Sequence, residues 1–170
     1  MEAHPVEPPD IPAGARMWRA YGDAHPQSVR ASPEYTVEHF GDSQHLANSL
    51  LELLIAGKKR ATSELVADFI ARGDQVPRIG SHWIACDGAG TPRIVIRSTE
   101  LRIGSFWSAD ESFAAAEGED DLSLTSWRRE HRRYWMRVSA AQGRDWSEED
   151  EIVFKRFAVV WPPEHTDSTR

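Results

Sequence analysis

The stretch Gly57-Lys58-Lys59-Arg60-Ala61-Thr62 marks the point where the chain leaves a helix and enters an extended segment. The apolar run from Leu46 to Ile55 has helical spacing, and the glycine after it is a typical helix stop. Three consecutive cations beside a helix C-terminus are ordinarily explained by their favourable interaction with the helix dipole. The alternative is that they place positive charge at the mouth of a cavity. These residues alone leave both interpretations open.

The same stretch contains a family motif. Gly57-x-Lys59-x-x-Thr62 resembles the signature of the ASCH domain family, which belongs to the PUA-like fold group. Further matching segments follow the family order and are Trp18-x-x-Tyr21, Phe40-Gly41-Asp42, Glu117-Gly118-Glu119-Asp120 and Ser123-Leu124-x-x-Trp127-Arg128-x-x-His131. Together they span most of residues 17–161, as in the larger bacterial members. The ordered set is more specific than the short Lys/Thr motif.

The composition indicates one soluble domain. A chain of 170 residues is typical of a single domain, and 40% hydrophobic residues with seven tryptophans suffice for a core. No run approaches the ~20 apolar residues that a membrane span needs. The first residues lack the basic-then-apolar pattern of a secretory signal, and a lone cysteine forms neither an internal disulfide nor a zinc cluster. We therefore expect a cytoplasmic protein with no membrane partner, and its oligomeric state is left open.

Periodicity predicts the order of helices and strands. Helices are expected over residues 15–21, 43–56, 63–72, 108–116 and 122–141. Extended segments or strands are expected at residues 35–40, 59–62, 81–87, 92–103 and 151–161, and a loop at residues 22–33. Residues 1–14 and 164–170 are expected to be flexible tails, which leaves residues 15–163 as a single domain.

This order of elements favours an α+β fold, since strands cluster in the middle and at the end of the chain. The family resemblance implies more, namely a PUA-like small, partly open β-barrel of mixed or antiparallel strands with about four to five helices around it. Periodicity alone does not show that a barrel closes.

The resemblance also implies an activity. Family members that hydrolyse the amide of acylated cytidine use a lysine, a threonine and a glutamate, which correspond to Lys59, Thr62 and Glu117 here. Glu119 is the alternative carboxylate. In this assignment Thr62 is the nucleophile, Lys59 removes its proton, and Glu117 protonates the leaving amine. Backbone amides near Gly57 would hold the oxyanion.

Two physical conditions apply to this assignment. Lys59 acts as a base only if burial or the neighbouring cations Lys58 and Arg60 depress its pKa well below the usual ~10.4. Lys59 and Thr62 are three residues apart, so a regular strand would point them to opposite faces, and a turn or bulge must intervene. An ordinary ion pair between Lys59 and Glu117 is the structural alternative.

An acidic cluster follows the predicted helix 108–116. It consists of Glu117, Glu119, Asp120 and Asp121, whose carboxylates could hold a divalent cation. The alternative is a solvated loop that stabilises the N-terminus of the next helix. We assign no metal ligands, and we expect a cofactor, Mg²⁺ or Mn²⁺, only if the protein is a ribonuclease.

The predicted helix 122–141 is amphipathic. At 100° per residue, its apolar stripe contains Leu124, Trp127, His131, Tyr134, Trp135 and Val138. Arg129, Arg133 and Arg137 lie on the opposite face, which is either a solvated surface or a track for RNA phosphates. A hydrogen-bonded core residue is the expected role of His131.

Further side chains are predicted to bind substrate, and they are Trp18, Tyr21, Phe40, Lys58, Arg60, Ser123 and Arg128. The pair Trp18 and Tyr21 either packs in the core or stacks on a base. Ser123 binds phosphate or caps its helix, and Arg128 borders the apolar stripe and can reach into a pocket. Trp107 is expected in the core or in a base pocket.

These observations give three functional hypotheses. The first is a hydrolase directed at RNA or at a modified nucleoside, with amide hydrolysis at an acylated cytidine-type base. The second is a ribonuclease of single-stranded RNA, with or without a divalent metal, in which Lys59 stabilises phosphate charge. The third is a non-catalytic module that binds RNA or a nucleotide in translation-linked regulation. A net charge of −7 argues only against binding of nucleic acid through bulk charge.

Overall fold

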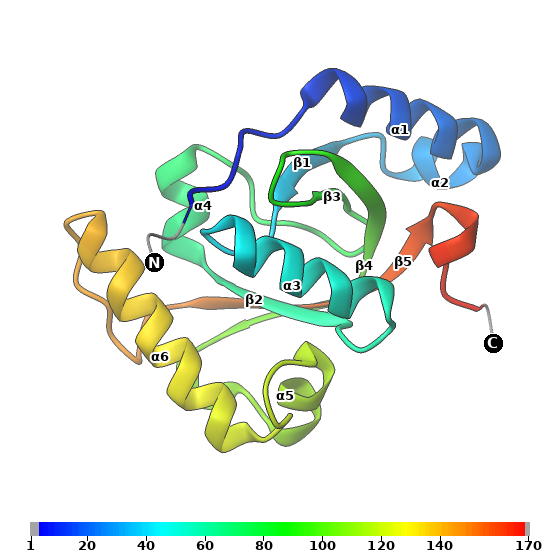
Figure 1. The fold of residues 1–170 in the computed structure, drawn as a ribbon. Helices are drawn as coiled ribbons and strands as arrows, with labels where there is room; N and C mark the ends of the chain where they lie inside the picture. The colour runs from blue at the N-terminus through cyan, green and yellow to red at the C-terminus, as the bar shows by residue number, and fades with distance from the viewer. Residues whose placement is uncertain (1–3, 169–170) are drawn as a thin grey trace. The chain divides into compact units, whose positions relative to one another are not determined.

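The computed structural model describes residues 4–168 (Figure 1). Contacts between residues divide the chain into two compact units. Unit 1 comprises the described residues up to Gly57, residues 78–99, and the described residues from Phe157 onward. Unit 2 comprises residues 58–77 and 100–156.

The strands form a mixed five-stranded sheet in the order β1-β3-β4-β5-β2. The strands are β1 (Tyr35–His39), β2 (Ala61–Leu65), β3 (His82–Cys86), β4 (Pro92–Gly104) and β5 (Ile152–Trp161). β1 pairs with β3 in parallel, whereas the β3–β4 and β2–β5 pairs are antiparallel. β4 and β5 contribute residues to both units. The predicted α+β fold with a small, partly open barrel of strands and surrounding helices is confirmed.

Unit 1 contains α1 (Ile11–Ala24), α2 (Pro26–Ala31), α3 (Gln44–Ile55) and the short helix η2 (Pro163–His165). The helix starts follow local chemistry, since the side chains of Asp10 and Ser43 accept hydrogen bonds from the first turns of α1 and α3. One core cluster of unit 1 contains Phe40, Leu50, Leu51, Leu54, Ala85, Ile94, Ile96, Phe157 and Val159. A second contains Tyr21, Ile84 and Val95, with partly buried aromatic residues packed around them.

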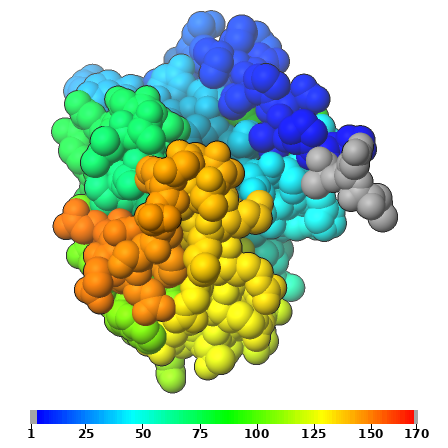
Figure 2. Space-filling model, turned by 90° about the vertical axis from the view of Figure 1, so that its left-hand side faces the viewer, coloured from blue at the N-terminus to red at the C-terminus, as the bar shows by residue number. Residues whose placement is uncertain are grey.

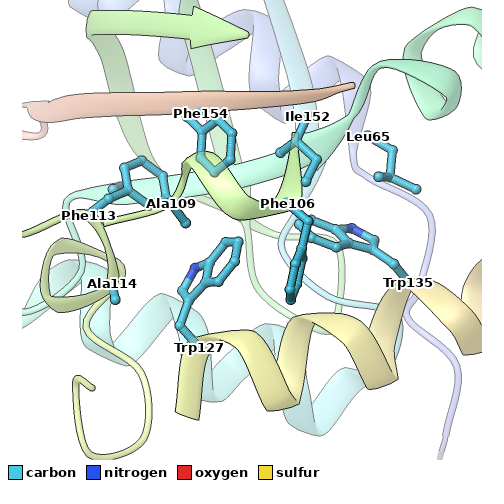
Figure 3. Packing of buried hydrophobic residues seen from close by; sticks show 10 residues of the cluster. Leu65, Phe106, Ala109, Phe113, Ala114, Trp127, Trp135, Ile152 and Phe154 are labelled. Carbon is cyan, nitrogen blue, oxygen red and sulfur yellow. The ribbon is translucent and has the colours of Figure 1, made fainter. Parts of the chain in front are cut away.

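Unit 2 contains α4 (Val66–Arg72), the short helix η1 (Phe106–Ser108), α5 (Glu111–Glu117) and α6 (Leu124–Ala141). Its core has aromatic residues from several elements (Figure 3). Trp127 and Trp135 of α6 point towards Phe106 and Phe154, so the predicted apolar stripe of this helix is indeed its buried face. The same turns of α6 also position polar groups, as described below.

Several boundaries differ from those expected from the sequence. α1 begins at Ile11 rather than at residue 15, and α2 forms where a loop was expected. The helix expected from residue 63 begins at Val66, because residues 61–65 pair with β5 instead. This cross-strand pairing has no local sequence signal, so periodicity placed the boundary too early.

The two expected tails are partly ordered where they are described. The backbone N–H groups of Glu7 and Asp10 donate to carbonyls of Gly88 and Gly90, and that of Asp167 donates to the carbonyl of Val159. Residues 1–3 and 169–170 of the expected tails lie outside the described residues. The described parts of both stretches are thus hydrogen-bonded to other residues of unit 1.

Gly118 brings the end of α5 against the segment at residues 58–60. Its φ of +70° lies in the left-handed region, and a Cβ atom there would lie 2.2 Å from the carbonyl oxygen of Lys58. The N–H of Arg60 donates to the carbonyl of Ala116 over 2.7 Å. Glycine is therefore required twice, for its backbone conformation and for the close approach of two backbones.

We predict that Gly118→Ala destabilises the protein more than Gly143→Ala. Gly143 has a φ of +68°, and nothing lies within 4 Å of the position that a Cβ atom would take there, so alanine costs only the left-handed conformation, about 1–2 kcal/mol. At Gly118 the overlap with Lys58 adds about 1–3 kcal/mol. Urea unfolding of both variants measures the difference, and equal losses would contradict the proposed close approach.

Candidate functional site

The side chain of Lys59 is buried among carboxylates of unit 2. Only 1% of it is exposed. Its Nζ donates to Oε2 of Glu119 over 2.9 Å, to Oε1 of Glu117 over 3.3 Å, and to the backbone carbonyl of Glu117 over 3.2 Å. The structure thus brings together Lys59 and both of the carboxylates that the family resemblance offered as alternatives.

The second carboxylate oxygen of Glu117 receives three more donors. Ser63 Oγ donates to it over 2.8 Å, the Trp127 indole N–H also donates to it, and His131 Nε2 lies 3.2 Å away. Glu117 is 2% exposed, so these donors replace the water that a carboxylate would otherwise bind. We call Lys59, Ser63, Glu117, Glu119, Trp127 and His131 the charge cluster.

Local structure explains how the donors reach Glu117. Trp127 and His131 are four residues apart on α6, so their side chains lie on the same face of the helix. Their rings stack with centroids 4.2 Å apart, and His131 Nδ1 bonds to the Trp127 carbonyl over 2.9 Å. Ser63, Trp127 and His131 were not predicted as site residues. The i, i+4 spacing on a stripe that begins just after the acidic loop was the available signal for the last two.

Thr62 lies on β2 next to Ser63. Successive side chains of a strand alternate between its faces. Ser63 lies on the face of the buried residues Ala61 and Leu65, and its hydroxyl reaches Glu117. Thr62 is half-buried, and its ladder partner on β5 is Lys155. The hydroxyl that contacts Glu117 is therefore that of Ser63.

The electrostatic environment of Lys59 argues against its predicted role as a base. Burial lowers the pKa of Lys59, but the negative charges of Glu119 and Glu117 and the hydrogen bonds to them outweigh burial and raise the pKa above its ordinary value. The base role requires a depressed pKa, whereas the surroundings of Lys59 favour its charged form. Of the neighbouring cations, Lys58 is exposed and the Arg60 guanidinium donates to the Lys59 carbonyl.

The surroundings of Glu117 and His131 favour the charged form of each group. Burial raises the pKa of Glu117, yet the positive charges of His131 and Lys59 and the hydrogen bonds lower it to about 2. Burial lowers the pKa of His131, but the charge of Glu117 and its hydrogen bond raise it overall. Two cations and two carboxylates therefore compensate one another within the charge cluster.

The acidic loop is divided between two roles. Ligand atoms of Glu117, Glu119 and His131 lie within 4.8 Å of one another, a spacing at which a metal ion could be held. Asp120 instead bonds to Ser126 and Arg129, and the Asp121 carboxylate accepts from the N–H of Ser123. The last two acids thus stabilise the start of α6, as the helix-capping interpretation predicted.

The predicted substrate-binding residues of unit 1 lie in packed surroundings. Tyr21 is buried, and its hydroxyl lies 3.1 Å from His82 Nε2. Trp18 stacks on Tyr35 with ring centroids 4.5 Å apart. Phe40 stacks on Trp83 at 4.4 Å. All three aromatic side chains therefore pack against other residues of unit 1.

Two predicted substrate-binding residues of unit 2 lie at the start of α6. Ser123 caps the helix, because its hydroxyl oxygen accepts from the N–H of Ser126. The Arg128 guanidinium lies over the ring of Trp107, 5.0 Å from its centroid. Figure 2 shows the outer surface of α6, in yellow and light orange, open at the front of the view. Arg129 and Arg133 on this outer face pair with Glu130.

None of the described helices is long and apolar enough to cross a membrane.

Comparisons with known proteins identify the relatives of the chain. Residues 36–161 match the family model of the ASCH domain. An ASCH domain from Lactobacillus crispatus JV V101 is 25% identical and superposes with a TM-score of 0.80. The match covers 88% of this chain and 95% of the Lactobacillus chain. A protein from Enterococcus faecalis V583 is 28% identical, with coverage of 88% and 89% and a TM-score of 0.77. No match was found among curated protein sequences.

We predict that Glu117→Gln strongly destabilises the protein. Removal of one partner from a buried ion pair leaves the other charge uncompensated and costs about 3–5 kcal/mol. The control is Glu34→Gln, whose partner Arg78 lies 2.7 Å away with both side chains more than half exposed. That change should cost about 0–1 kcal/mol. Denaturant unfolding separates the two, and a loss below about 1 kcal/mol at Glu117 would contradict the buried pair.

We also predict that His131 titrates above its ordinary value of about 6.5 and that Glu117→Gln lowers its pKa. The raised pKa stabilises the fold fully below the unfolded value, and this contribution is lost as pH rises through the folded pKa. NMR titration of the His131 ring in the native protein and in the variant measures both values. A native pKa at or below about 6.5 would show that the imidazolium does not pair with Glu117.

Proposed function

Because this chain belongs to the ASCH domain family, we propose that it is an RNA- or nucleoside-directed hydrolase that cleaves the amide of an acylated cytidine-type base. The observation that supports this proposal is the buried ammonium of Lys59, fixed between Glu117 and Glu119. In the reaction water adds to the acyl carbonyl, the C–N bond breaks, and a carboxylic acid and the free exocyclic amine leave.

Lys59 acts in this proposal as a fixed positive charge. Since its pKa is raised, it keeps its proton, and a substrate carbonyl that replaces Glu119 as the acceptor of one N–H group would receive that hydrogen bond as negative charge develops on its oxygen. Preorganised donors of this kind stabilise a transition state because they need no reorientation during the reaction. The role of Lys59 is thus oxyanion stabilisation rather than removal of a proton.

The two carboxylates have different roles. Glu117 is buried and accepts from several donors, and its pKa is lowered to about 2, so it is a poor source of protons near neutral pH. Glu119 is 34% exposed and bonds to the same ammonium, so its carboxylate can meet a substrate or a water molecule. We assign proton transfer to Glu119 and the orientation of Lys59 and Ser63 to Glu117.

The attacking group is either a hydroxyl or water. The family resemblance assigns the nucleophile to Thr62, whereas the hydroxyl that donates to Glu117 is that of Ser63. Thr62→Ala and Ser63→Ala, compared in the same assay, separate these possibilities. If neither change reduces the rate more than about tenfold, direct attack by water is supported.

A metal-assisted ribonuclease is the second candidate. The spacing of Glu117, Glu119 and His131 supports it, and carboxylates are suitable ligands for Mg²⁺ or Mn²⁺. A cation at this place would have to displace the Lys59 ammonium, which is 2.9 Å from Glu119. The metal-independent hydrolase therefore agrees better with the charge cluster.

We predict that Lys59→Met lowers the turnover of N4-acetylcytidine about 10²–10³-fold, as expected for the loss of one oxyanion donor. Methionine retains most of the volume but not the charge. Arg78→Met removes a cation whose side chain is 67% exposed and should leave turnover nearly unchanged. Product formation is followed chromatographically, with circular dichroism to verify that each variant is folded.

The same assay includes short RNAs, each with EDTA, Mg²⁺ or Mn²⁺. Cleavage of RNA that depends on the metal would favour the ribonuclease. Binding of RNA without turnover of any acylated nucleoside or RNA would contradict both enzymes and leave a binding module.

A further inference from the structure

Trp107 and Arg128 form an exposed stacked pair on unit 2. The indole of Trp107 is 49% exposed, and the Arg128 guanidinium lies 5.0 Å from the ring centroid. An exposed indole with a cation on its ring presents both an aromatic face and a positive charge to the solvent.

Arg128 differs from three other stacked arginines of unit 2, which are Arg102, Arg132 and Arg156. Arg132 lies over Phe106 and pairs with Glu148 over 2.7 Å, and Arg156 pairs with Glu100 over 3.8 Å. Arg102 lies over Phe154, which is buried. Within residues 4–168, Arg128 has no carboxylate partner, and its buried Nε has no hydrogen-bond acceptor. Its charge is therefore not compensated by a carboxylate and remains available for a ligand.

Trp107 and Arg128 each directly follow a buried aromatic residue of unit 2 in the sequence. Phe106 is buried and contacts Trp127 with ring centroids 5.6 Å apart, while the next residue, Trp107, faces outward. Trp127 donates to Glu117, and the next residue on α6 is Arg128. Trp107 and Arg128 are thus each anchored by a preceding core ring, and these two rings, Phe106 and Trp127, lie in the core shown in Figure 3.

We propose that Trp107 and Arg128 bind a nucleobase of single-stranded RNA, with the base on the exposed indole and the guanidinium on the adjacent phosphate. Indole and guanidinium planes are the groups on which unpaired bases stack. With a net charge of −7, attraction for phosphate must be local, and Arg128 supplies it. This inference rests on the proposed function only for the class of ligand, because it concerns binding and not turnover.

The test measures binding of fluorescein-labelled hexaadenylate and hexauridylate RNA to the full chain by fluorescence anisotropy at low salt. We expect Trp107→Leu to weaken binding of hexaadenylate about tenfold or more, and Trp107→Phe to weaken it less, because phenylalanine retains a smaller ring. Hexaadenylate should bind more tightly than hexauridylate, since a purine stacks over a larger area. Arg128→Gln should weaken binding and reduce the salt dependence of the affinity.

Two variants on the exposed side of α6 serve as controls. Arg133→Gln removes a charge from a side chain that is 71% exposed, and Met136→Ala truncates an apolar side chain that is 56% exposed. Both should bind RNA within about twofold of the native protein. Thermal unfolding verifies that all variants are folded, and the indole N–H signal lost in Trp107→Leu should be one that shifts when RNA is added to the native protein.

The proposal is overturned if the native protein binds neither RNA, if Trp107→Leu binds like the native protein, or if Arg133→Gln loses as much as Arg128→Gln. Absence of turnover with intact, Trp107-dependent RNA binding would refute the hydrolase and leave this inference standing. Turnover of acetylcytidine with no RNA binding would refute this inference and leave the hydrolase standing.

Discussion

The buried ammonium of Lys59 is the group on which the organisation of unit 2 depends. A charge removed from water is strongly unfavourable unless opposite charges and hydrogen bonds replace the solvent. Glu117 and Glu119 supply the opposite charges. Glu117 is itself buried and needs donors of its own, which come from Ser63 on β2 and from Trp127 and His131 on α6. One buried charge therefore requires β2, the end of α5 and the start of α6 to meet.

Main-chain contacts also hold the end of α5 against residues 58–60. The end of α5 lies so close to residues 58–60 that Gly118 has no room for a side chain, and the two segments share the hydrogen bond from Arg60 to Ala116. Because this approach is made by main-chain atoms, the positions of Lys59 and Glu117 do not depend on flexible side chains alone. A site built in this way is preorganised, as stabilisation of a developing charge requires.

Compensation within the charge cluster also sets its chemistry. A lysine beside two carboxylates is a permanent donor rather than a base, and a glutamate with four donors is a permanent acceptor rather than an acid. Glu119 is more exposed than Glu117, Lys59 and His131, and for that reason we propose it, rather than Glu117, for proton transfer. Burial and the number of hydrogen-bond donors thus distinguish Glu117 from Glu119 without reference to any family.

The sequence by itself determined the fold class, the amphipathic face of α6 and the start of α3, because these follow from periodicity and from the capping residue Ser43. The family motifs also identified Lys59 together with Glu117 and Glu119. Tertiary structure alone decided which hydroxyl reaches Glu117 and that His131 pairs with it, since the register of β2 on β5 and the docking of α5 are contacts between distant parts of the chain. It also decided the direction of the Lys59 pKa shift, because that direction depends on whether burial or the facing carboxylates have the larger effect.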